Sequence, residues 1–557
     1  MMSPHHYPPD DIHAKSRQKI DAEIAQLEAR IIALKITQNS LSPITRLHRE
    51  VIQDIFVLAS QESRFIQNGK ASLLISWVCR SWRELAHQCS ALWSSIDFTN
   101  TTWIQAALSR TKSRPLSSSL SVPLDYSGDL DFLASLCLGN LPRISKLVIS
   151  SLSRNEDLDD FTHLSPLWLT PAPQLVELSL YNLSLPSGLF SGTCPALQRL
   201  FLGTCKFDWK GLPIHDGIKR LNISSPIDRI SAHDLVQQLR MLGPEVEDLS
   251  FRDTLLLTVA HPSSSQTRHE FANLKAFIMY EDTSPGATYI LNQLSLPLCF
   301  GRAIISVGGS PSERLDIAQA LTSCRGLAKW PVNSLEVDVQ DDCITIAVNE
   351  DSQMTVEGQQ VPRISLTFDQ SKDISDIVPV LDALPLPPIK ILSLSSGQFH
   401  DLGPTLTDYF DAQGALERLD LCIKFVPTFS GMLYMHIQQL RELVGCRDNG
   451  DIKKEDVNDK MKAQCRGILA FHQLTTLRYH GAASDEFPSA LIHYSVIREW
   501  LMWRQVAGLG LKTLIFEEMV APPEDYLVTL YEPFVEKFDC VGIQEMTRDW
   551  TPFSPES

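Results

Sequence analysis

The sequence lacks any run that approaches the ~18 consecutive apolar residues of a membrane-spanning helix, and its first residues lack the apolar segment of a signal peptide. Its 12 cysteines form no CxxC pair, no zinc-type Cys/His spacing and no short disulfide framework. Cysteines scattered in this way are typical of reduced thiols that pack as small apolar side chains. These absences predict a cytoplasmic or nuclear location, or both, and no membrane partner.

Positive charge is scarce relative to negative charge. The chain has 49 Lys and Arg residues against 66 Asp and Glu residues, a formal net charge of −17. The imbalance lies beyond residue 98, because residues 1–98 contain 11 basic and 10 acidic residues. An acidic body repels phosphate backbones, and no cluster of basic and aromatic residues opposes this effect. The composition therefore predicts that nucleic acid is not a partner.

Sequence motifs of catalysis and cofactor binding are absent as well. There is no HExxH, no HxH, no GxGxxG and no GxxxxGK[ST]. The stretch Val307-Gly308-Gly309-Ser310 follows a strand-like run, but it is more typical of a turn into a capped helix than of a phosphate site. Cys79 lies among apolar residues at helical spacing, which indicates a small packed side chain rather than a nucleophile. We therefore expect a protein that is not an enzyme and that has no catalytic residues, metal or cofactor.

The first 39 residues divide into a Pro- and His-containing start, which we predict to be disordered over residues 1–10, and an amphipathic helix. Ile20, Ile24, Leu27, Ile31 and Leu34 recur at intervals of 4, 3, 4 and 3, the a/d spacing of a coiled coil. Only about two heptads are present. We expect a helix that packs on the following segment or on another subunit, with self-dimerisation as the second interpretation.

Apolar residues between positions 40 and 98 recur at helical spacing around two short connections. They form two stripes, one of Val51, Ile52, Ile55, Phe56 and Leu58, and one of Leu74, Val78 and Trp82. A module of about sixty residues buries little surface, so we expect a partner to complete the burial of these stripes. The alternative is a helical cap on the domain that follows.

One set of residues within this segment matches a known pattern, namely Leu47-His48-Arg49-Glu50-Val51-Ile52, Ile55-Phe56, Val78-Cys79-Arg80-Ser81-Trp82-Arg83-Glu84-Leu85-Ala86 and Leu92-Trp93. It resembles the F-box, in particular the version found in large fungal F-box-like families. One departure is His48, which stands where F-boxes usually carry the proline that pre-sets the first helical turn. The resemblance implies docking onto the Skp-type adaptor of a Skp–cullin–F-box ubiquitin ligase, and through the adaptor onto a cullin. The residues that it implies for this contact are Leu47, Val51, Ile52, Ile55, Phe56, Val78, Cys79 and Trp82.

Beyond residue 140 a short template of the form L-x-x-L-x-L returns twelve times. Its central residues are Leu147, Leu178, Leu200, Leu221, Leu249, Phe277, Leu335, Ile364, Leu392, Leu419, Leu477 and Leu514. Most intervals between them are 21 to 37 residues, and two are 58, as if one degenerate copy were missed in each. The stretch from Gly301 to Gly309 can supply the first missing strand, and the second gap holds a charged helical insertion near 431–468.

This template is similar to that of the leucine-rich repeat, whose period is about 20–29 residues. Leu197 to Phe207 match its longer form, with Cys205 at the position usually taken by Asn or Cys. The resemblance implies an irregular solenoid of strands and return helices over 141–530, between a linker or cap at 99–140 and a tail at 531–557. The expected fold class is α+β, or an α/β repeat: a helical F-box at 40–98 followed by an irregular leucine-rich-repeat solenoid. The alternative is an ordinary α/β sheet whose strands are similar by coincidence.

Two functions follow from these patterns. The first is a substrate-recognition subunit of a Skp–cullin–F-box ligase, acting in ubiquitin-dependent protein degradation, whose repeats bind an unknown target protein. The second is a repeat scaffold for protein binding without a ligase role, in which the N-terminal helices only cap the solenoid. Exposure separates them, because docking leaves the stripe around Leu47, Val51, Ile55 and Trp82 accessible, whereas a cap buries it. An enzyme with a dispersed active site is a third hypothesis.

Candidate target-binding residues come from the alternation of side chains along a strand. Residues between the core leucines face away from the core. Among the residues at such positions, those that we predict to contact a target protein are Glu177, Tyr181, Arg199, Phe201, Arg220, Arg252, Tyr280, Arg418 and Arg478. Arg and Tyr are the residue types that most often dominate the binding energy of protein interfaces.

Overall fold

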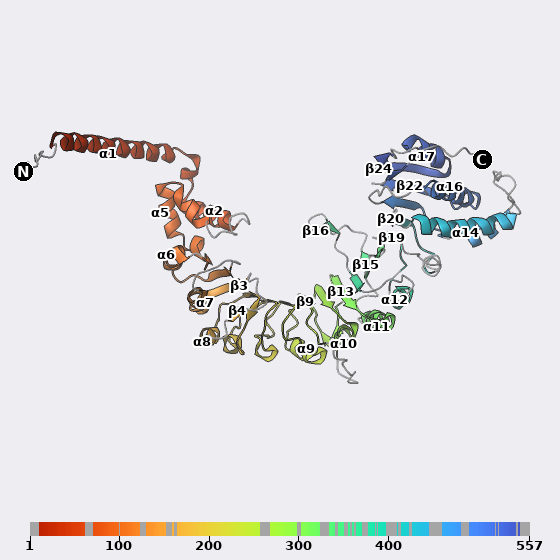
Figure 1. Ribbon diagram of the computed structural model, residues 1–557, viewed down its shortest axis with the longest axis horizontal. Helices are drawn as coiled ribbons and strands as arrows, with labels where there is room; N and C mark the ends of the chain where they lie inside the picture. Colours follow the sequence, from red (N-terminus) through yellow and green to blue (C-terminus); the bar gives the residue numbers. More distant parts are fainter. Residues whose placement is uncertain are drawn as a thin grey trace, which may run out of the picture. The chain divides into compact units, whose positions relative to one another are not determined.

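The structure is a computed structural model of the whole chain (Figure 1). It describes residues 11–61, 71–99, 101–122, 130–151, 159–160, 164–256, 268–297, 302–322, 334–339, 343–349, 355–356, 359–360, 364–369, 377–384, 386, 388–396, 409, 414–422, 426–444, 459–469, 471–480, 490–517, 520–521, 523–541 and 544–545. The start predicted to be disordered, residues 1–10, lies outside the described residues. The chain divides into two compact units, Met1–Leu197 with Gly211–Pro213 and Gln198–Lys210 with Ile214–Ser557, and we describe each by itself.

The first unit begins with helices. They are α1 (Asp11–Ser40), a 3-10 turn at Pro43–Arg46, α2 (Arg49–Gln61), α4 (Ala71–Trp77), α5 (Arg80–Gln88) and a second 3-10 turn at Ser90–Trp93. Cys79 caps α5, because its Sγ accepts a hydrogen bond from the Trp82 N–H at 3.4 Å. Proline at Pro43 starts the first 3-10 turn, where its fixed φ is favourable.

Four parallel strands follow in the first unit, in the order β1 (Ser95–Asp97), β2 (Leu116–Val122), β3 (Ile144–Ser151) and β5 (Glu177–Tyr181). Between them lie α6 (Thr101–Thr111), α7 (Leu130–Leu138) and α8 (Ser165–Trp168), and the short strands β4 (Asp159–Asp160) and β6 (Leu183–Ser184) pair with each other. The stretch 99–140, where the sequence predicts a linker or cap, contributes α6 and β2. The sheet therefore begins before residue 140.

The second unit contains thirteen of the seventeen strands that build the main sheet structure of the described residues. They are β7 (Arg199–Gly203), β8 (Arg220–Ser224), β9 (Asp248–Arg252), β11 (Ala276–Glu281), β13 (Arg302–Gly308), β14 (Ser334–Val339), β15 (Cys343–Asn349), β18 (Ile364–Asp369), β19 (Ile391–Ser396), β20 (Arg418–Cys422), β21 (Thr476–His480), β22 (Leu511–Glu517) and β24 (Val535–Val541). The helices are α9 (Ala232–Leu239), α10 (Ser284–Gln293), α11 (Pro311–Thr322), α12 (Val378–Ala383), α14 (Val426–Val444), α15 (Asp459–Ile468), α16 (Ala490–Val506) and α17 (Glu524–Tyr531).

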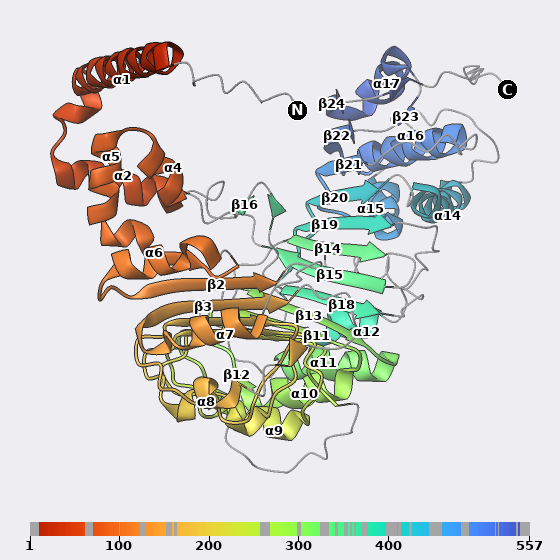
Figure 2. The same ribbon diagram turned by 60° about the vertical axis from the view of Figure 1, so that its left-hand side comes forward.

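One face of this sheet is covered by helices, as the views of Figures 1 and 2 show for α9, α10 and α11 beneath the strands from β9 to β13. The template residues form the core between the two layers. Leu200, Leu221, Leu249 and Phe277 are neighbours in register across β7, β8, β9 and β11, and all are buried. Leu235 and Leu239 of α9 and Ile290 of α10 are buried from the helix side. The core leucines therefore face the helices, and the alternate residues face outward.

The expected solenoid is not what these strands form. In a solenoid each repeat contacts only its neighbours, so the strand order follows the sequence. In the second unit the order departs from the sequence and runs β13, β18, β15, β14, β19, with β15 antiparallel to both of its neighbours. The fold class predicted from the sequence was therefore wrong: the strands form a large, mostly parallel α/β sheet, not a helical F-box followed by a leucine-rich-repeat solenoid. The template misled because it describes any strand that packs under helices, and it carries no information about which strand lies beside which.

Two other local predictions can be compared with the structure. The first interval of 58 residues contains β13 at Arg302–Gly308, where the sequence predicts a strand. A capped helix follows it, since Glu313 Oε2 accepts a hydrogen bond from the Ser310 N–H at 2.7 Å and Pro311 opens α11. The second interval contains α14 and α15, and the charged loop 447–456 lies outside the described residues. Residues 531–557, where we expect a tail, contribute β24, which pairs with β22.

Glu281 is a buried carboxylate at the end of β11, with only 5% of its surface exposed. Its Oε1 accepts hydrogen bonds from the Thr254 N–H at 3.0 Å and from the Thr254 hydroxyl at 2.5 Å, and its Oε2 accepts one from the Leu255 N–H at 3.0 Å. Burial raises the pKa of this carboxyl, and the hydrogen bonds partly oppose the rise. Glu281 thus accepts hydrogen bonds from the backbone N–H groups of the turn after β9. The leucine-rich-repeat pattern has Asn or Cys at this turn, whereas this sequence has Thr254.

We expect Glu281→Gln to lower the free energy of unfolding of the second unit by about 1 kcal/mol at about pH 5, because Gln keeps one acceptor oxygen and loses the other. The folded pKa of Glu281 is raised, so its carboxyl stabilises the fold most below the unfolded pKa of about 4.3 and loses this contribution as the pH rises through the folded pKa. The difference between wild type and variant should therefore narrow towards about pH 8. Urea titrations at several pH values measure it, and a difference that widens with pH would contradict the argument.

Candidate protein-docking surfaces

The helices of residues 41–98 bury one part of their apolar side chains. Ile52 and Phe56 of α2 are 4% and 1% exposed, and the Phe56 ring lies against the Trp82 ring with 4.8 Å between centroids. Trp93 is fully buried, and its Nε1–H donates to the Ala86 carbonyl at 2.7 Å. These contacts join α2, α5 and the 3-10 turn at Ser90–Trp93 around one small core.

Another part of their apolar side chains is exposed. We call it the apolar docking surface, and it consists of Leu47, Val51, Ile55, Leu58, Leu74, Trp77 and Val78. The exposed fractions run from 36% for Ile55 to 67% for Trp77. Val51, Ile55 and Leu58 share a face of α2 at intervals of four and three residues, and Leu74, Trp77 and Val78 do the same on and just after α4.

The structure separates the eight residues that the F-box resemblance implies for adaptor contact. Leu47, Val51, Ile55 and Val78 lie on the apolar docking surface. Ile52 and Phe56 do not, because they are core residues, and Trp82 is half-buried against Phe56. Cys79 acts as the cap of α5. The periodicity missed Trp77, although a tryptophan directly before Val78 at the end of an apolar helix is a visible signal.

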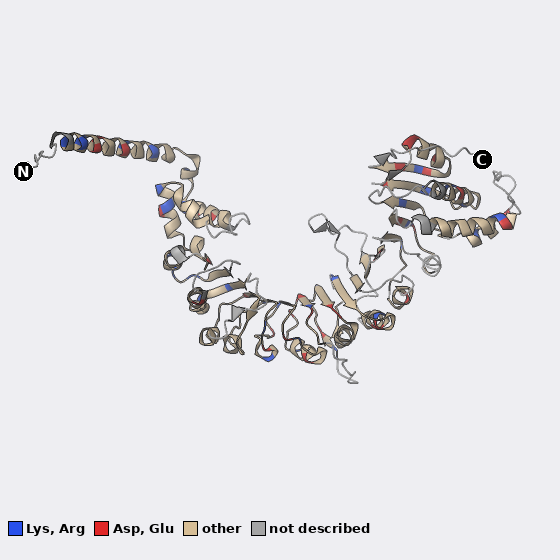
Figure 3. Ribbon diagram, viewed as in Figure 1, with Lys and Arg blue, Asp and Glu red and all other residues tan. Residues whose placement is uncertain are grey.

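Helix α1 exposes its apolar stripe as well. Ile20, Ile24, Leu27, Ile31 and Leu34 are about half exposed, between 48% and 59%. The side chains of residues 14–40 are all exposed, so α1 does not pack its stripe on the following helices as expected. Within residues 14–40, charged residues of one sign occur in groups along the same helix (Figure 3): Lys15, Arg17 and Lys19 come first, Asp21, Glu23 and Glu28 follow, and Arg30 and Lys35 come last.

A second surface lies on the face of the second unit's sheet that is opposite α9, α10 and α11. We call it the arginine face, and it consists of Arg199, Phe201, Arg220, Arg252, Ile278, Tyr280, Arg302 and Ile304. Strand register brings these residues together, since Phe201, Asn222, Ser250, Ile278 and Ile304 form one continuous row across β7, β8, β9, β11 and β13. A parallel row runs through Arg199, Arg220, Asp248, Ala276 and Arg302. Every member of the arginine face is at least partly exposed.

Specific contacts order two of these arginines. Arg220 Nε lies 2.9 Å from Asp248 Oδ2 and its Nη2 lies 3.9 Å from Glu247 Oε2, and the Arg220 side chain is 50% exposed. The Arg252 guanidinium lies 4.6 Å from the centre of the Tyr280 ring, its partner in register. The sequence prediction included five members of this face, Arg199, Phe201, Arg220, Arg252 and Tyr280, and the structure brings them together. It omitted Arg302 and Ile304, because β13 does not carry the repeat template, although the alternation Arg302, Ile304, Ser306 is visible in the sequence.

The remaining predicted residues lie apart from the arginine face. Arg418 makes two hydrogen bonds of 2.8 Å to the Asp420 carboxylate, and Arg478 pairs with Glu517 and lies 3.9 Å from Asp420. This network on β20, β21 and β22 alternates in sign. Glu177 and Tyr181 belong to β5 of the first unit, where Glu177 Oε1 lies 2.8 Å from Lys146 Nζ and Tyr181 is 39% exposed.

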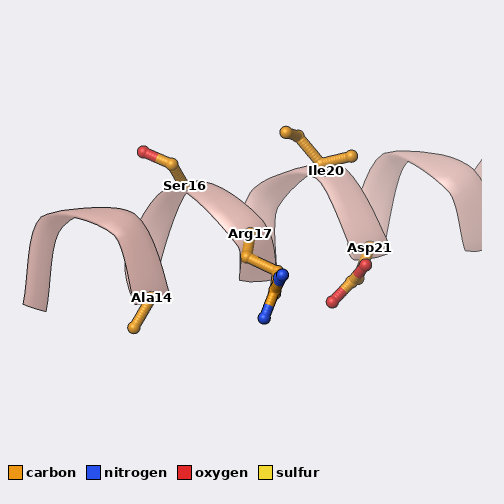
Figure 4. A pocket seen from close by; sticks show the side chains of 5 residues that line it. All are labelled: Ala14, Ser16, Arg17, Ile20 and Asp21. Carbon is orange, nitrogen blue, oxygen red and sulfur yellow. The ribbon is translucent and has the colours of Figure 1, made fainter. Parts of the chain in front are cut away.

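Groups that could perform chemistry are not assembled in the part of the chain that the structure describes. No three His, Cys, Asp or Glu side chains there are arranged to hold a metal ion. Burial raises the pKa of Cys137 to about 12 and that of Cys194 to about 11, so these thiols stay protonated. The hollow shown in Figure 4 is lined by Ala14, Ser16, Arg17, Ile20 and Asp21, which come from α1 alone and point in different directions.

Comparison with protein-family models and with curated proteins identifies no match for this chain, so the function is inferred from these two surfaces. Among the described helices, none has both the length and the hydropathy needed to cross a bilayer.

Proposed function

We propose that this chain is the substrate-recognition subunit of a Skp–cullin–F-box ubiquitin ligase. Residues 41–98 dock onto the Skp-type adaptor, and the sheet face of the second unit opposite α9, α10 and α11 binds a target protein. The observation that supports this proposal is the apolar docking surface, which remains accessible on helices that also bury a small core of their own.

Exposure favours docking over a cap. A cap on the sheet would bury the outer apolar stripe of α2 against the strands, in addition to Ile52 and Phe56, which are buried within the helical module itself. Instead Leu47, Val51 and Ile55 stay 42%, 45% and 36% exposed. Burying a Leu, Val or Ile side chain is worth about 1.5–3 kcal/mol, so a contiguous group of such residues left in water is a site where a partner gains affinity.

The buried residues of the module have a supporting role in this proposal. The Phe56 and Trp82 rings pack against each other at a tilt of 53° and hold α2 against α5, and Cys79 caps the start of α5 next to the exposed Val78. The adaptor would then contact Val51 and Ile55 on α2, Trp77 at the end of α4 and Val78 just after it. The contact would be apolar, because none of these side chains carries a charge.

We expect Val51→Asp combined with Val78→Asp to reduce capture of a purified Skp-type adaptor by the full chain at least about tenfold, since two charges would be desolvated at the interface. The matched control is Ile227→Asp with Met241→Asp, which changes two exposed apolar residues of the second unit by the same charge. Capture by the wild type should change little between about 0.05 and 0.5 M salt, because apolar contacts are not screened.

Two outcomes of this pull-down would overturn the proposal. One is equal capture by wild type and by the Val51/Val78 variant when circular dichroism shows both folded. The other is adaptor capture that the Ile227/Met241 control reduces as strongly, which would show that any added negative charge, and not the docking surface, governs recovery.

A further inference from the structure

We propose that the arginine face binds an acidic segment of a partner protein in which carboxylate side chains flank an apolar one. The proposal rests on the proposed function only in identifying that partner with the target to be ubiquitinated. The binding chemistry itself is argued from the second unit alone.

Charge is the first reason. The arginine face carries four arginines, Arg199, Arg220, Arg252 and Arg302, and the only carboxylate within its rows in the described strands is Asp248. This local excess of positive charge stands on a chain with a formal net charge of −17. Polar surfaces of protein complexes pair opposite potentials, so the face selects an anionic partner, whereas the rest of the acidic chain repels it.

The charge balance on β20, β21 and β22 differs from that of the arginine face, and this difference supports an anionic partner. On those strands Arg418 and Arg478 alternate with Asp420 and Glu517, so the cations are matched by carboxylates within the network. A surface of that kind is internally satisfied and gains little from an added carboxylate. Between β7 and β13 the four arginines outnumber the carboxylates that contact Arg220, which are those of Asp248 and Glu247. A partner's carboxylates can therefore add charge-assisted, bidentate hydrogen bonds to Arg252 and Arg302.

The apolar residues of the face set the second requirement. Ile278 and Ile304 are adjacent in register on β11 and β13, and both are partly exposed. Tyr280 follows Ile278 on the same face with the Arg252 guanidinium 4.6 Å from its ring, and Arg302 precedes Ile304 by two positions. An apolar side chain placed on the two isoleucines would therefore have Arg252 towards one side and Arg302 towards the other. An aromatic with an adjacent arginine is a frequent anchor in protein interfaces.

A set of three synthetic peptides tests the proposal with the full chain, by fluorescence polarisation. The first alternates Glu with Leu, the second replaces every Glu by Gln, and the third replaces every Glu by Lys. We expect the Glu peptide to bind at least about tenfold more tightly than the Gln peptide, to lose affinity with added salt, and the Lys peptide not to bind. Arg252→Glu with Arg302→Glu should weaken the Glu peptide at least about tenfold.

The matched control is Lys206→Glu with Lys210→Glu, which makes the same change in net charge at exposed lysines outside the face, and it should change affinity less than about twofold. Equal binding of the Glu and Gln peptides, or equal weakening by the two double variants, would overturn the proposal. Adaptor capture is measured on the same variants. If the Arg252/Arg302 variant still captures the adaptor but no longer binds the Glu peptide, the peptide site is distinct from the adaptor site. If the wild type does not capture the adaptor, the proposed ligase role is wrong, and the peptide result is unaffected.

Discussion

Replacing Arg504 by Ala is expected to destabilise the C-terminal part of the second unit by about 3–5 kcal/mol. Arg504 lies on α16 with no exposed surface, and its two terminal nitrogens donate to the carbonyls of Phe471 and Leu474 at 2.9 and 3.0 Å. Phe471 adopts a left-handed backbone with φ of 59°, which costs energy for a residue with a side chain. The variant would leave two buried carbonyls without these donors and the strained turn without its support.

The charge of Arg504 persists despite its burial. Desolvation lowers its pKa to about 10, so the guanidinium is still protonated at neutral pH. Its guanidinium carbon also lies 4.9 Å from the centre of the Trp500 ring, which offsets part of the desolvation. Arg504→Lys should recover only part of the loss, because an ammonium cannot present two nitrogens to two carbonyls in one plane.

Hydrogen exchange measures this prediction most directly, because it resolves the loss by segment. Protection should fall first for the amides of β21, which begins next to the turn that Arg504 holds. The control is Arg498→Ala, an exposed arginine on the same helix, which should leave protection within about 0.5 kcal/mol of wild type. If Arg504→Ala lowered protection no more than Arg498→Ala does, the hydrogen bonds to the two carbonyls would not stabilise this part of the fold.

Leu419→Ala is the second large effect that we expect, a loss of about 2–5 kcal/mol. Leu419 is 1% exposed as the second residue of β20, between Leu392 of β19 and Leu477 of β21 in register. Removing its side chain leaves a cavity that the close-packed core fills only in part. The surface control is Leu443→Ala on α14, where the side chain is 36% exposed and the change should cost far less.

Hydrogen exchange also shows which strands the Leu419→Ala substitution destabilises. Because Leu419 contacts neighbouring strands in an extended sheet, exchange should rise most in β19, β20 and β21 and least in β7 and β8. Exchange that rises equally over all strands of the second unit would contradict this and indicate a single cooperative core.

Strand positions could be predicted from the sequence, and strand neighbours could not. The central residues of all twelve template matches lie on strands, from β3 to β22, because alternating burial is a local property of five or six residues. The place of β14 beside β15 and β19, rather than beside β13, depends on hydrogen bonds between residues far apart in the chain. No local pattern records such a choice, and the repeat interpretation therefore gave the wrong fold class.

The candidate sites show the same division. Helical periodicity identified Val51, Ile52, Ile55 and Phe56 as one apolar stripe, but the stripe is wide enough to supply two faces. Only the packing of Phe56 on Trp82 shows that Ile52 and Phe56 point inward and that Val51 and Ile55 point outward. Glu281 escaped prediction for a related reason, since a single acidic residue at a strand end looks like a solvated turn until the Thr254 backbone is placed beside it.

By itself the sequence determined the acidic character of the chain, the helical segment between residues 40 and 98, the outward positions of Arg199, Arg220 and Arg252, and the capped start of α11. Each of these depends on composition or on contacts within a few residues. The tertiary structure decided the order of the strands, the joining of Arg302 to the arginine face, and which half of the α2 stripe remains exposed. These depend on which distant segments share a sheet edge or a core, and burial is a property of that assembly rather than of any single segment.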